Sequence, residues 1–247
     1  MAKRKIKIIE LKSVGSTNTY AKSLAEKGEA EGLIIIADEQ TEGRGRSGKS
    51  FFSPAETGLY MSILVRPNIS VEESLAITSI TAIAAARAIE SVANIQCGIK
   101  WVNDIYIDYK KVAGILTEGS FDYKADKVNY VIVGIGINLE KPENDFPDEL
   151  KNVATSLGNK KIKTALYKKI AEEFFGLLNS LPSKEYIKEY KSRSIILNKR
   201  IEVLANERYF ATAVDIDDEC RLKIITENGE ERLLSSGEVS LKIQKGE

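Results

Sequence analysis

GRGRSGKSFFSP, residues 43–54, is the segment of this 247-residue chain that decides between two fold classes. Its first eight residues satisfy both the G-x-G-x-x-G pattern of dinucleotide-binding loops and the G-x-x-x-x-G-K-[ST] pattern of P-loops. Both motifs need a helix directly after the loop, because the N-terminus of that helix holds the phosphate. Here Pro54 disfavours a helix at Ser53, and the next regular element, residues 58–66, has the composition of a strand. The context therefore argues against a dinucleotide-binding or P-loop fold.

Outward from this loop, the hydrophobic pattern predicts a mixed α/β domain. We expect strands at residues 5–12, 33–37, 58–66, 98–107, 111–117 and 128–139, and helices at residues 16–28, 70–94, 164–181 and 182–193. A capping box at residues 70–73 begins the second helix, which is rich in alanine and isoleucine. Turns at residues 108–110 and 121–127 join the last three strands as antiparallel hairpins. This order differs from the strand–helix alternation of a doubly wound sheet.

The character of the chain changes after Asn198. Short strands are expected at residues 200–205, 208–216, 221–226, 231–234 and 239–243. Asn228 and Gly229 form the centre of a hairpin turn. A run of short strands is typical of a small barrel. We therefore divide the chain into a larger domain, residues 1–195, and a small C-terminal barrel, residues 196–247.

The composition excludes several classes of site. The chain contains no histidine, which removes Ser-His-Asp and Cys-His catalysis and HExxH zinc sites. Lys and Arg together number 36, as do Asp and Glu, so the net charge is zero and no bulk attraction to nucleic acid is expected. Cys97 and Cys220 form no CxxC motif, and we interpret them as reduced thiols of core type.

The N-terminal segment, MAKRKIKIIELK, is basic but contains no continuous apolar stretch, so we do not expect a signal peptide. We find no window of the roughly 20 apolar residues that span a bilayer. The expected location is the cytoplasm, without a membrane partner.

Several polar segments are weak signals when each is taken alone. Arg44, Arg46 and Lys49 lie within six residues on a glycine-rich backbone, which favours a loop that closes on an anion. KWVND, residues 100–104, lies near a strand end, where a turn-forming Asn-Asp pair is the simpler interpretation. VGIGINL, residues 133–139, carries two glycines in a strand, which indicates close approach of a ligand or of another backbone.

Taken together and in this order, the segments resemble the biotin–protein ligases, also called biotin–[acetyl-CoA-carboxylase] ligases. The resemblance rests on Ser16-Thr17-Asn18, Gln40, the glycine-arginine loop, KWVNDI at residues 100–105, KVAGILTE at residues 111–118 and VGIGINL. It covers the whole chain. It implies a largely antiparallel sheet with helices, of the class II aminoacyl-tRNA synthetase and biotin ligase type, plus an SH3-like C-terminal β-barrel. The N-terminal helix-turn-helix of repressor-type members is expected to be absent.

This sequence departs from the pattern of the family at three positions. Lys49 stands where the family often has arginine, Phe51 where tryptophan is usual, and Val102 where proline is common. These departures bear on how the nucleotide packs and leave the rest of the resemblance intact.

The resemblance also implies the site residues and their roles. The biotin site would comprise Ser16, Thr17, Asn18, Gln40, Arg44, Gly45, Arg46 and Lys111, and the nucleotide site Arg46, Lys49, Phe52 and Asn138. Lys111, Arg46 and Asp104 would act in catalysis. Asp104 would either bind magnesium or help the acceptor lysine to lose its proton.

The implied activity is ATP-dependent formation of biotinyl-5′-AMP, followed by transfer of biotin to one lysine of a biotin carboxyl carrier domain of a carboxylase. The substrates would be ATP and biotin with Mg²⁺, with no permanently bound cofactor. The sequence leaves a homodimer open and predicts no nucleic-acid partner. Two alternatives stay open: an ATPase or kinase that uses residues 43–50 as a P-loop, and a lipoate-type ligase of the same fold.

Overall fold

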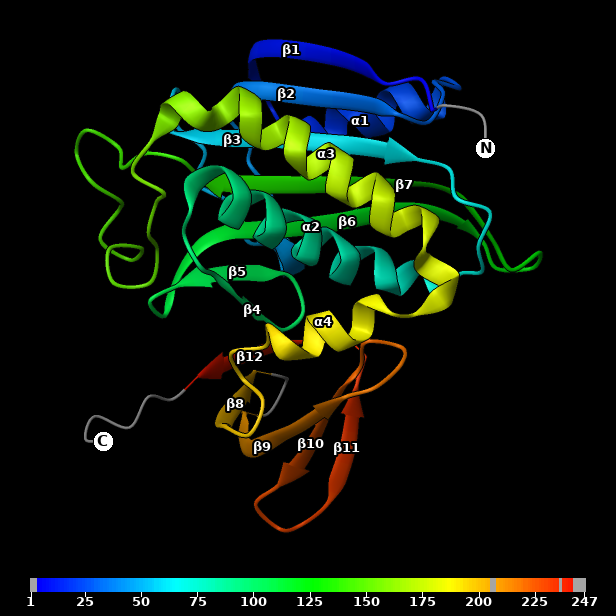
Figure 1. Ribbon diagram of the computed structural model, residues 1–247, viewed down its shortest axis with the longest axis vertical. Helices are drawn as coiled ribbons and strands as arrows, with labels where there is room; N and C mark the ends of the chain where they lie inside the picture. The colour runs from blue at the N-terminus through cyan, green and yellow to red at the C-terminus, as the bar shows by residue number, and fades with distance from the viewer. Residues whose placement is uncertain (1–3, 205–207, 236, 242–247) are drawn as a thin grey trace.

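Successive residues of a strand face opposite sides of a sheet, and in this chain both sides of the large sheet are covered by apolar layers. The structure, a computed structural model, describes residues 4–204, 208–235 and 237–241. These residues form a seven-stranded sheet flanked by helices and a separate five-stranded antiparallel sheet (Figure 1). The expected fold, a mixed α/β domain with a largely antiparallel sheet and a small C-terminal β-unit of SH3-like type, is confirmed.

The large sheet has the strand order β1-β2-β3-β7-β6-β5-β4. Its strands are β1 (Lys7–Val14), β2 (Leu33–Gln40), β3 (Gly58–Val65), β4 (Gly98–Lys100), β5 (Asp104–Ile107), β6 (Lys110–Asp122) and β7 (Lys127–Asn138). β1 and β2 run parallel because α1 (Thr17–Glu26) returns the chain between them, and the other neighbouring pairs are antiparallel. Asp108 and Tyr109 have φ angles of 47° and 60° and form the predicted turn between β5 and β6.

Two helical segments begin at the predicted capping residues. Ser16 caps α1 by accepting a hydrogen bond from the backbone N–H of Thr19. In the predicted capping box, Ser70 N donates to Glu73 Oε2 at 2.8 Å and Glu73 N donates to Ser70 Oγ at 3.1 Å. This box begins a 3₁₀ turn that leads into α2 (Ala76–Ala93). Two more helices, α3 (Lys163–Asn179) and α4 (Tyr186–Ser192), follow β7.

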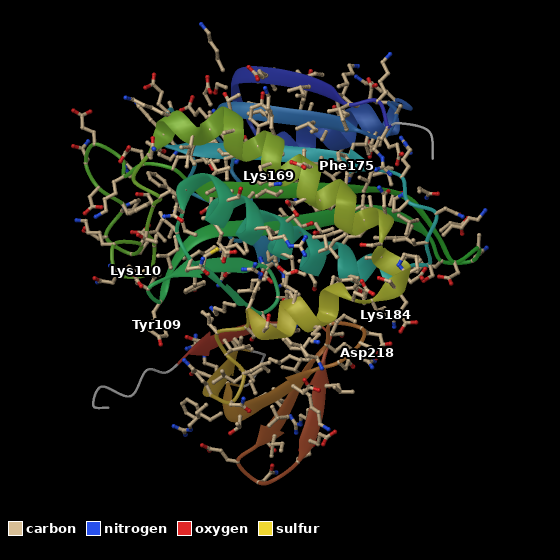
Figure 2. The ribbon with its side chains drawn as sticks, in the orientation of Figure 1. Tyr109, Lys110, Lys169, Phe175, Lys184 and Asp218 are labelled. Carbon is tan, nitrogen blue, oxygen red and sulfur yellow. The ribbon has the colours of Figure 1, made fainter. Side chains whose placement is uncertain are left out.

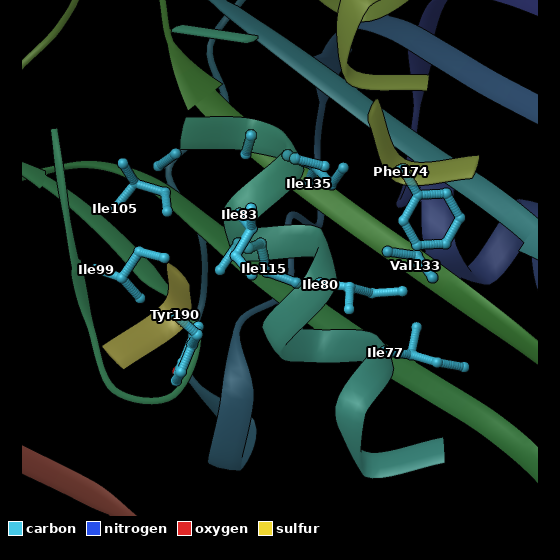
Figure 3. Packing of buried hydrophobic residues seen from close by; sticks show 14 of the residues in the cluster. Ile77, Ile80, Ile83, Ile99, Ile105, Ile115, Val133, Ile135, Phe174 and Tyr190 are labelled. Atoms are coloured by element: carbon cyan, nitrogen blue, oxygen red, sulfur yellow. The ribbon is translucent and has the colours of Figure 1, made fainter. Parts of the chain in front are cut away.

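The two faces of the sheet carry different layers. On one face, α2 and α3 cover the sheet, and Ile77, Ile80 and Ile83 of α2 pack near Ile115 and Ile135 (Figure 3). Each fully buried isoleucine contributes roughly 1.5–3 kcal/mol to stability. On the other face, α1 covers only part of the sheet, above a smaller apolar cluster that includes residues 33, 35 and 132. The rest of that face is available for a site.

The helix at the centre of the larger layer is unusually apolar. Residues 73–93 are long and apolar enough to cross a membrane by length and composition, so the expectation that no window reaches bilayer length was too strong. In the structure, 67% of the most apolar window of this helix is buried. Its hydrophobicity is thus accounted for by its place in the core.

The expected single strand at residues 98–107 was wrong. The structure divides it into β4 and β5, which pair antiparallel across a turn at residues 101–103. Each turn residue is anchored separately: Trp101 Nε1 donates to the Cys220 carbonyl at 2.9 Å, Tyr190 Oη donates to the Val102 carbonyl at 2.9 Å, and Asn103 Nδ2 donates to the Ile115 carbonyl at 2.8 Å. Two of these partners lie 88 and 119 residues away in the sequence, so the apolar run alone did not reveal the turn.

The C-terminal sheet has the strand order β11-β10-β9-β8-β12. Its strands are β8 (Arg200–Leu204), β9 (Tyr209–Ile216), β10 (Leu222–Thr226), β11 (Glu231–Leu234) and β12 (Glu238–Leu241). The ends of the predicted strands at residues 205 and 242–243 lie outside the described residues. α4 lies between the two sheets, and Lys184 and Asp218 lie on the two sides of the junction (Figure 2). The domain boundary at residues 195 and 196 stays a prediction.

An ion-pair network joins α2, α3 and α4. Arg87 donates to Glu173 at 3.0 Å and to both carboxylate oxygens of Glu189, while Arg193 contacts Glu189 at 2.9 Å and Glu90 at 2.7 Å. Burial raises the pKa of Glu189, but hydrogen bonds from Arg87 and Arg193 outweigh it and lower that pKa overall. The pKa of Glu173 is lowered in the same way, against burial, by Lys169 and Arg87.

A carboxyl group whose pKa is lowered on folding stabilises the protein above its unfolded pKa, and this contribution is lost as the pH falls through the folded pKa. We expect Arg87→Met to lower the free energy of unfolding at pH 7, with the difference from wild type narrowing as the pH falls from about 5 to about 3. Urea unfolding at a series of pH values measures this. Lys22→Met, in an exposed pair with Glu26 at 4.0 Å, serves as the control. A difference that stays constant with pH would show that the charge of Arg87 does not lower the pKa of Glu173 and Glu189.

Candidate active site

The glycine-rich loop forms a short closed hairpin on the less covered face of the sheet. Phe51 N donates to the Gly43 carbonyl at 2.9 Å, and Gly45 N donates to the Lys49 carbonyl at 2.7 Å. A Cβ atom at Gly43 would lie 2.2 Å from the Phe51 carbonyl oxygen, so the loop can close only around glycine. No α-helix follows within residues 46–57, and the next regular element is β3. The glycines therefore allow a hairpin to close. Because a P-loop requires a helix directly after the loop, this structure contradicts the P-loop alternative.

Tyr60 secures the far end of this loop. Its hydroxyl donates to the Pro54 carbonyl at 3.0 Å, and its ring meets that of Phe51 edge-on at 6.5 Å between centroids. Burial raises the pKa of Tyr60 to about 12, so the hydroxyl keeps its proton and its donor role at neutral pH.

The two strand glycines of β7 admit side chains from other elements. A Cβ atom at Gly134 would lie 2.2 Å from Asn18 Oδ1, and one at Gly136 would lie 2.5 Å from the ring of Phe51. Close approach does occur at these glycines, but the expectation of a ligand or another backbone is corrected, because side chains of this chain make the contacts. As a result, the start of α1 and the end of the glycine loop both rest directly on β7.

These elements enclose a polar pocket, which we call the inner pocket. It contains about 440 Å³ of space, part of it open to solvent. Its lining comprises Ser16, Thr17, Asn18, Gln40, Arg44, Gly45, Phe51, Met61, Lys111, Gly114, Ile115, Leu116, Gly134, Ile135 and Gly136. The predicted biotin-site residues thus meet in one place, except for Arg46.

Buried polar side chains at the base of the inner pocket hold one another in place. Gln40 Oε1 accepts hydrogen bonds from Thr17 N at 2.9 Å and Thr17 Oγ1 at 3.0 Å. The Ser62 hydroxyl lies 2.8 Å from Thr17 Oγ1 and 2.6 Å from Asn18 Oδ1. Because buried polar groups are costly unless paired, such a preset network suits a ligand with several polar edges.

A second pocket, the outer pocket, adjoins the first and carries more positive charge. It contains about 580 Å³ of space, part of it open to solvent. Its lining comprises Gly45, Arg46, Ser47, Lys49, Ser50, Phe51, Lys100, Trp101, Asn103, Asp104, Lys111, Gly237 and Val239. Arg46 Nη1 donates to Asn103 Oδ1 at 3.1 Å, which ties the glycine loop to the turn between β4 and β5. Residues 237 and 239 belong to the C-terminal sheet or its approach, so both sheets contribute walls.

Lys111 lies where the two pockets meet. Both pockets include it in their lining, together with Gly45 and Phe51. Its Nζ lies 2.7 Å from Asp104 Oδ1 and 5.9 Å from the centroid of the Phe51 ring. Its backbone is fixed from outside the sheet, because Lys111 N donates to the Val153 carbonyl at 2.8 Å. A cation in this position faces any group that passes between the pockets.

Two of the predicted nucleotide residues lie apart from these pockets. Phe52 is exposed and lines neither pocket, and Asn138 instead donates to the Thr155 carbonyl at 2.9 Å. Lys49 and Arg46 do line the outer pocket, as does Asp104. The roles implied for all of these residues stay predictions.

Three polar or aromatic residues of the site received no role from the sequence. Phe51 was noted only as a departure from the family, although it lines both pockets. Ser62 lies within the strand β3, whose other residues are mostly apolar. A single hydroxyl in such a strand was the signal that could have indicated a polar contact at this position. Glu118 ends the KVAGILTE segment and binds two residues of the inner pocket, Asn18 and Arg44.

Comparison with known proteins places this chain in a family. The profile of the biotin/lipoate A/B protein ligase family matches residues 10–138, and that of the biotin protein ligase C terminal domain matches residues 196–242. The chain belongs to the biotin/lipoate A/B protein ligase family. The resemblance found in the sequence is thereby confirmed.

Individual members of the ligase family match over nearly the whole chain. The bifunctional ligase/repressor BirA of Bacillus spizizenii is 36% identical over 234 residues, which are 90% of this chain and 70% of the relative. The biotin–[acetyl-CoA-carboxylase] ligase of Mycobacterium tuberculosis is 29% identical, over 91% of this chain and 85% of the relative. The biotin protein ligase from Aquifex aeolicus, solved in complex with biotin and ATP, superposes with a TM-score of 0.78 at 30% identity, covering 96% of this chain and 99% of that one.

The glycine packing of this ligase fold can be tested by one added methyl group. Gly134→Ala should lower the free energy of unfolding by roughly 1–3 kcal/mol, because the new Cβ overlaps Asn18 in a closely packed layer. Gly176→Ala is the matched control: no atom lies within 4 Å of its new Cβ, and the helix α3 should gain roughly 0.5–1 kcal/mol. Thermal and urea unfolding measure both. Equal effects of the two substitutions would contradict the packing of Asn18 on β7.

Proposed function

We propose that this protein joins biotin to ATP, forming biotinyl-5′-AMP and pyrophosphate, and then transfers the biotinyl group to one lysine of the biotin carboxyl carrier domain of an acetyl-CoA carboxylase. One observation carries the proposal: a polar pocket and a cationic pocket meet at Lys111. The relatives support the same substrates: the Aquifex aeolicus ligase was solved in complex with biotin and ATP, and the Mycobacterium tuberculosis relative is a biotin–[acetyl-CoA-carboxylase] ligase.

The inner pocket suits the head group of biotin. The hydroxyls and amides of Ser16, Thr17, Asn18 and Gln40 present donors and acceptors to the ureido ring. A site that pairs each polar edge of its ligand rejects analogues that lack one, because its own groups would be left unpaired. This is the basis for preferring biotin to lipoate, which has no ureido group. The carboxylate at the end of the biotin tail would then lie towards Lys111.

The outer pocket suits the nucleotide. Arg46 and Lys49 supply positive charge from the loop, and Lys100 supplies more from β4. In the first step a carboxylate oxygen of biotin attacks the α-phosphorus of ATP, and the bond to pyrophosphate breaks. Positioning and charge dominate such a step, so a chain without histidine can catalyse it. Lys111 and Arg46 offset the negative charge that develops between the two substrates.

In the second step the acceptor lysine attacks the carbonyl carbon of the mixed anhydride, AMP departs, and the amine loses a proton. Asp104 is the carboxylate placed to receive it, since it lies 2.7 Å from Lys111 at the junction of the pockets. The same residue suits Mg²⁺ by its chemistry, because carboxylate oxygens are the ligands that Mg²⁺ prefers, and Lys111 holds Oδ1 until the ion arrives. The described residues contain no cluster of three or more ligating side chains, so a magnesium ion held by Asp104 would arrive with the phosphates of ATP, whose charge it would neutralise.

Mass spectrometry of a purified carrier domain tests the function directly. Incubation with the protein, ATP, magnesium and biotin should add one biotinyl group to one lysine, and lipoate in place of biotin should add nothing. Modification by lipoate alone would establish the lipoate-type alternative. ATP hydrolysis to ADP without modification of the carrier domain would support an ATPase instead.

Substitution of Lys111 separates chemistry from structure. Lys111→Ala should slow biotinyl-AMP formation by roughly 100- to 1000-fold, as loss of a charge-stabilising donor does. Its stability should change by no more than about 0.5 kcal/mol, as is usual for a partly exposed charge. Lys191→Ala is the control, because Lys191 has the same side-chain exposure, 32%, and pairs with Asp215 at 2.9 Å. Single-turnover assays measure adenylate formation. If Lys111→Ala forms the adenylate at a near-normal rate, Lys111 has no catalytic role and is an ordinary lysine at a strand end.

Closure of the glycine loop can be followed through Trp101, the only tryptophan of the chain. Its buried ring lines the outer pocket, so its fluorescence should change when biotin and ATP are added together. Cleavage by trypsin after Arg44, Arg46 or Lys49 should slow in parallel, because the bound adenylate holds residues 43–49 against the sheet. Cleavage rates that are equal with and without the ligands would contradict closure.

A further inference from the structure

We infer that Glu118 is a positioning residue for the biotin pocket: one carboxylate aligns the Asn18 amide and docks Arg44 of the glycine loop at the same time. The inference rests on the proposed function and deepens it. Glu118 lies on β6, beyond the segment that pairs with β5, and its side chain is 28% exposed.

Each oxygen of this carboxylate binds a different element. Oε1 lies 2.6 Å from Arg44 Nη2, and Oε2 accepts a hydrogen bond from Asn18 Nδ2 at 2.8 Å. Arg44 comes from the glycine loop and Asn18 from the first turn of α1, and both line the inner pocket. Glu118 therefore joins two elements of the pocket, the glycine loop and α1, through a third element, the strand β6.

The contact fixes the orientation of the Asn18 amide. Its two N–H donors are taken by Glu118 Oε2 and by the Leu116 carbonyl at 3.1 Å, while its Oδ1 lies 2.6 Å from the Ser62 hydroxyl. An amide rotated by half a turn would place oxygen against two acceptors. Glu118 thus occupies an Asn18 donor and leaves the second lone pair of Oδ1 as the part of this amide that can accept an N–H of the ureido ring.

The same contact restricts Arg44 while leaving it able to bind. Its side chain is 46% exposed and follows a glycine, so without a partner it would sample many rotamers. Glu118 holds Nη2, and Thr19 Oγ1 lies 3.4 Å from Nη1. A guanidinium has five N–H donors, so several remain for the carboxylate of biotin. Alignment before binding reduces the entropy lost on binding.

The test compares the KM for biotin with the KM for ATP. Glu118→Ala should raise the KM for biotin roughly 10- to 100-fold, as loss of hydrogen bonds to charged groups does, while the KM for ATP changes by less than about threefold. Glu118→Gln should fall between wild type and Glu118→Ala, because it keeps one acceptor oxygen but places an NH₂ donor against the second of the two donors, Arg44 or Asn18. Adenylate formation at varied biotin and ATP measures both constants.

Glu29→Ala is the matched control. Glu29 pairs with Lys7 at 2.7 Å and its side chain is 27% exposed, so it resembles Glu118 in burial and pairing, but its partner Lys7 lines neither pocket. It should leave both KM values unchanged. In the double variant Arg44→Ala/Glu118→Ala, the effect on the KM for biotin should be less than the product of the single effects, because the two residues act through one contact.

A readout without substrate keeps this inference distinct from the proposed function. Trypsin should cleave after Arg44 faster in unliganded Glu118→Ala than in wild type. If the wild type forms no biotinyl-AMP but this cleavage still rises, the docking role stands and the proposed function fails. A KM for biotin that stays within twofold of an active wild type overturns the inference. Equal loss of affinity for biotin and ATP, together with a lower melting temperature, overturns it as well, since Glu118 would then be structural.

Discussion

Contact of side chains with bare backbone on β7 is the constraint on which the rest of the site depends. Asn18 lies against Gly134 and Phe51 against Gly136, with no room for a Cβ atom at either glycine. The first contact brings the start of α1 down to the sheet, and the second brings down the end of the glycine loop. Since β6 runs beside β7, Lys111 and Glu118 come within reach of both. Two missing methyl groups thus set the depth of the inner pocket.

Three cations of this site already have partners within the chain, two of them carboxylates. Arg44 pairs with Glu118, Lys111 with Asp104, and Arg46 with the amide of Asn103. An anionic substrate therefore competes with internal partners for these contacts, while the lining of the outer pocket holds four cations, Arg46, Lys49, Lys100 and Lys111, against the one carboxylate of Asp104. Such competition weakens binding of any single anion, and it favours a pair of substrates that together engage all three cations.

Much of the fold followed from the sequence, because its signals are local. The capping residues Ser16 and Ser70 fixed the starts of two helical segments, and Asp108 and Tyr109 supplied a tight turn. The turn at residues 101–103 was not predicted, because an apolar strand pattern runs through it and its hydrogen-bond partners come from α4, β6 and the C-terminal unit. The role of Glu118 was not predicted for a related reason. It is separated from Arg44 by 74 residues, so neither segment of sequence indicates contact with the other.

The C-terminal sheet is more than an appendage in this arrangement. Gly237 and Val239 form part of the wall of the outer pocket, and the Cys220 carbonyl receives the indole N–H of Trp101 on the opposite unit. The residues of the small sheet that contact the large domain are consequently less free to change than those that face solvent. A substitution that shifts β12 or the turn at Cys220 by about an ångström changes the shape of the outer pocket. Selection for the shape of that pocket therefore also acts on residues that touch no substrate.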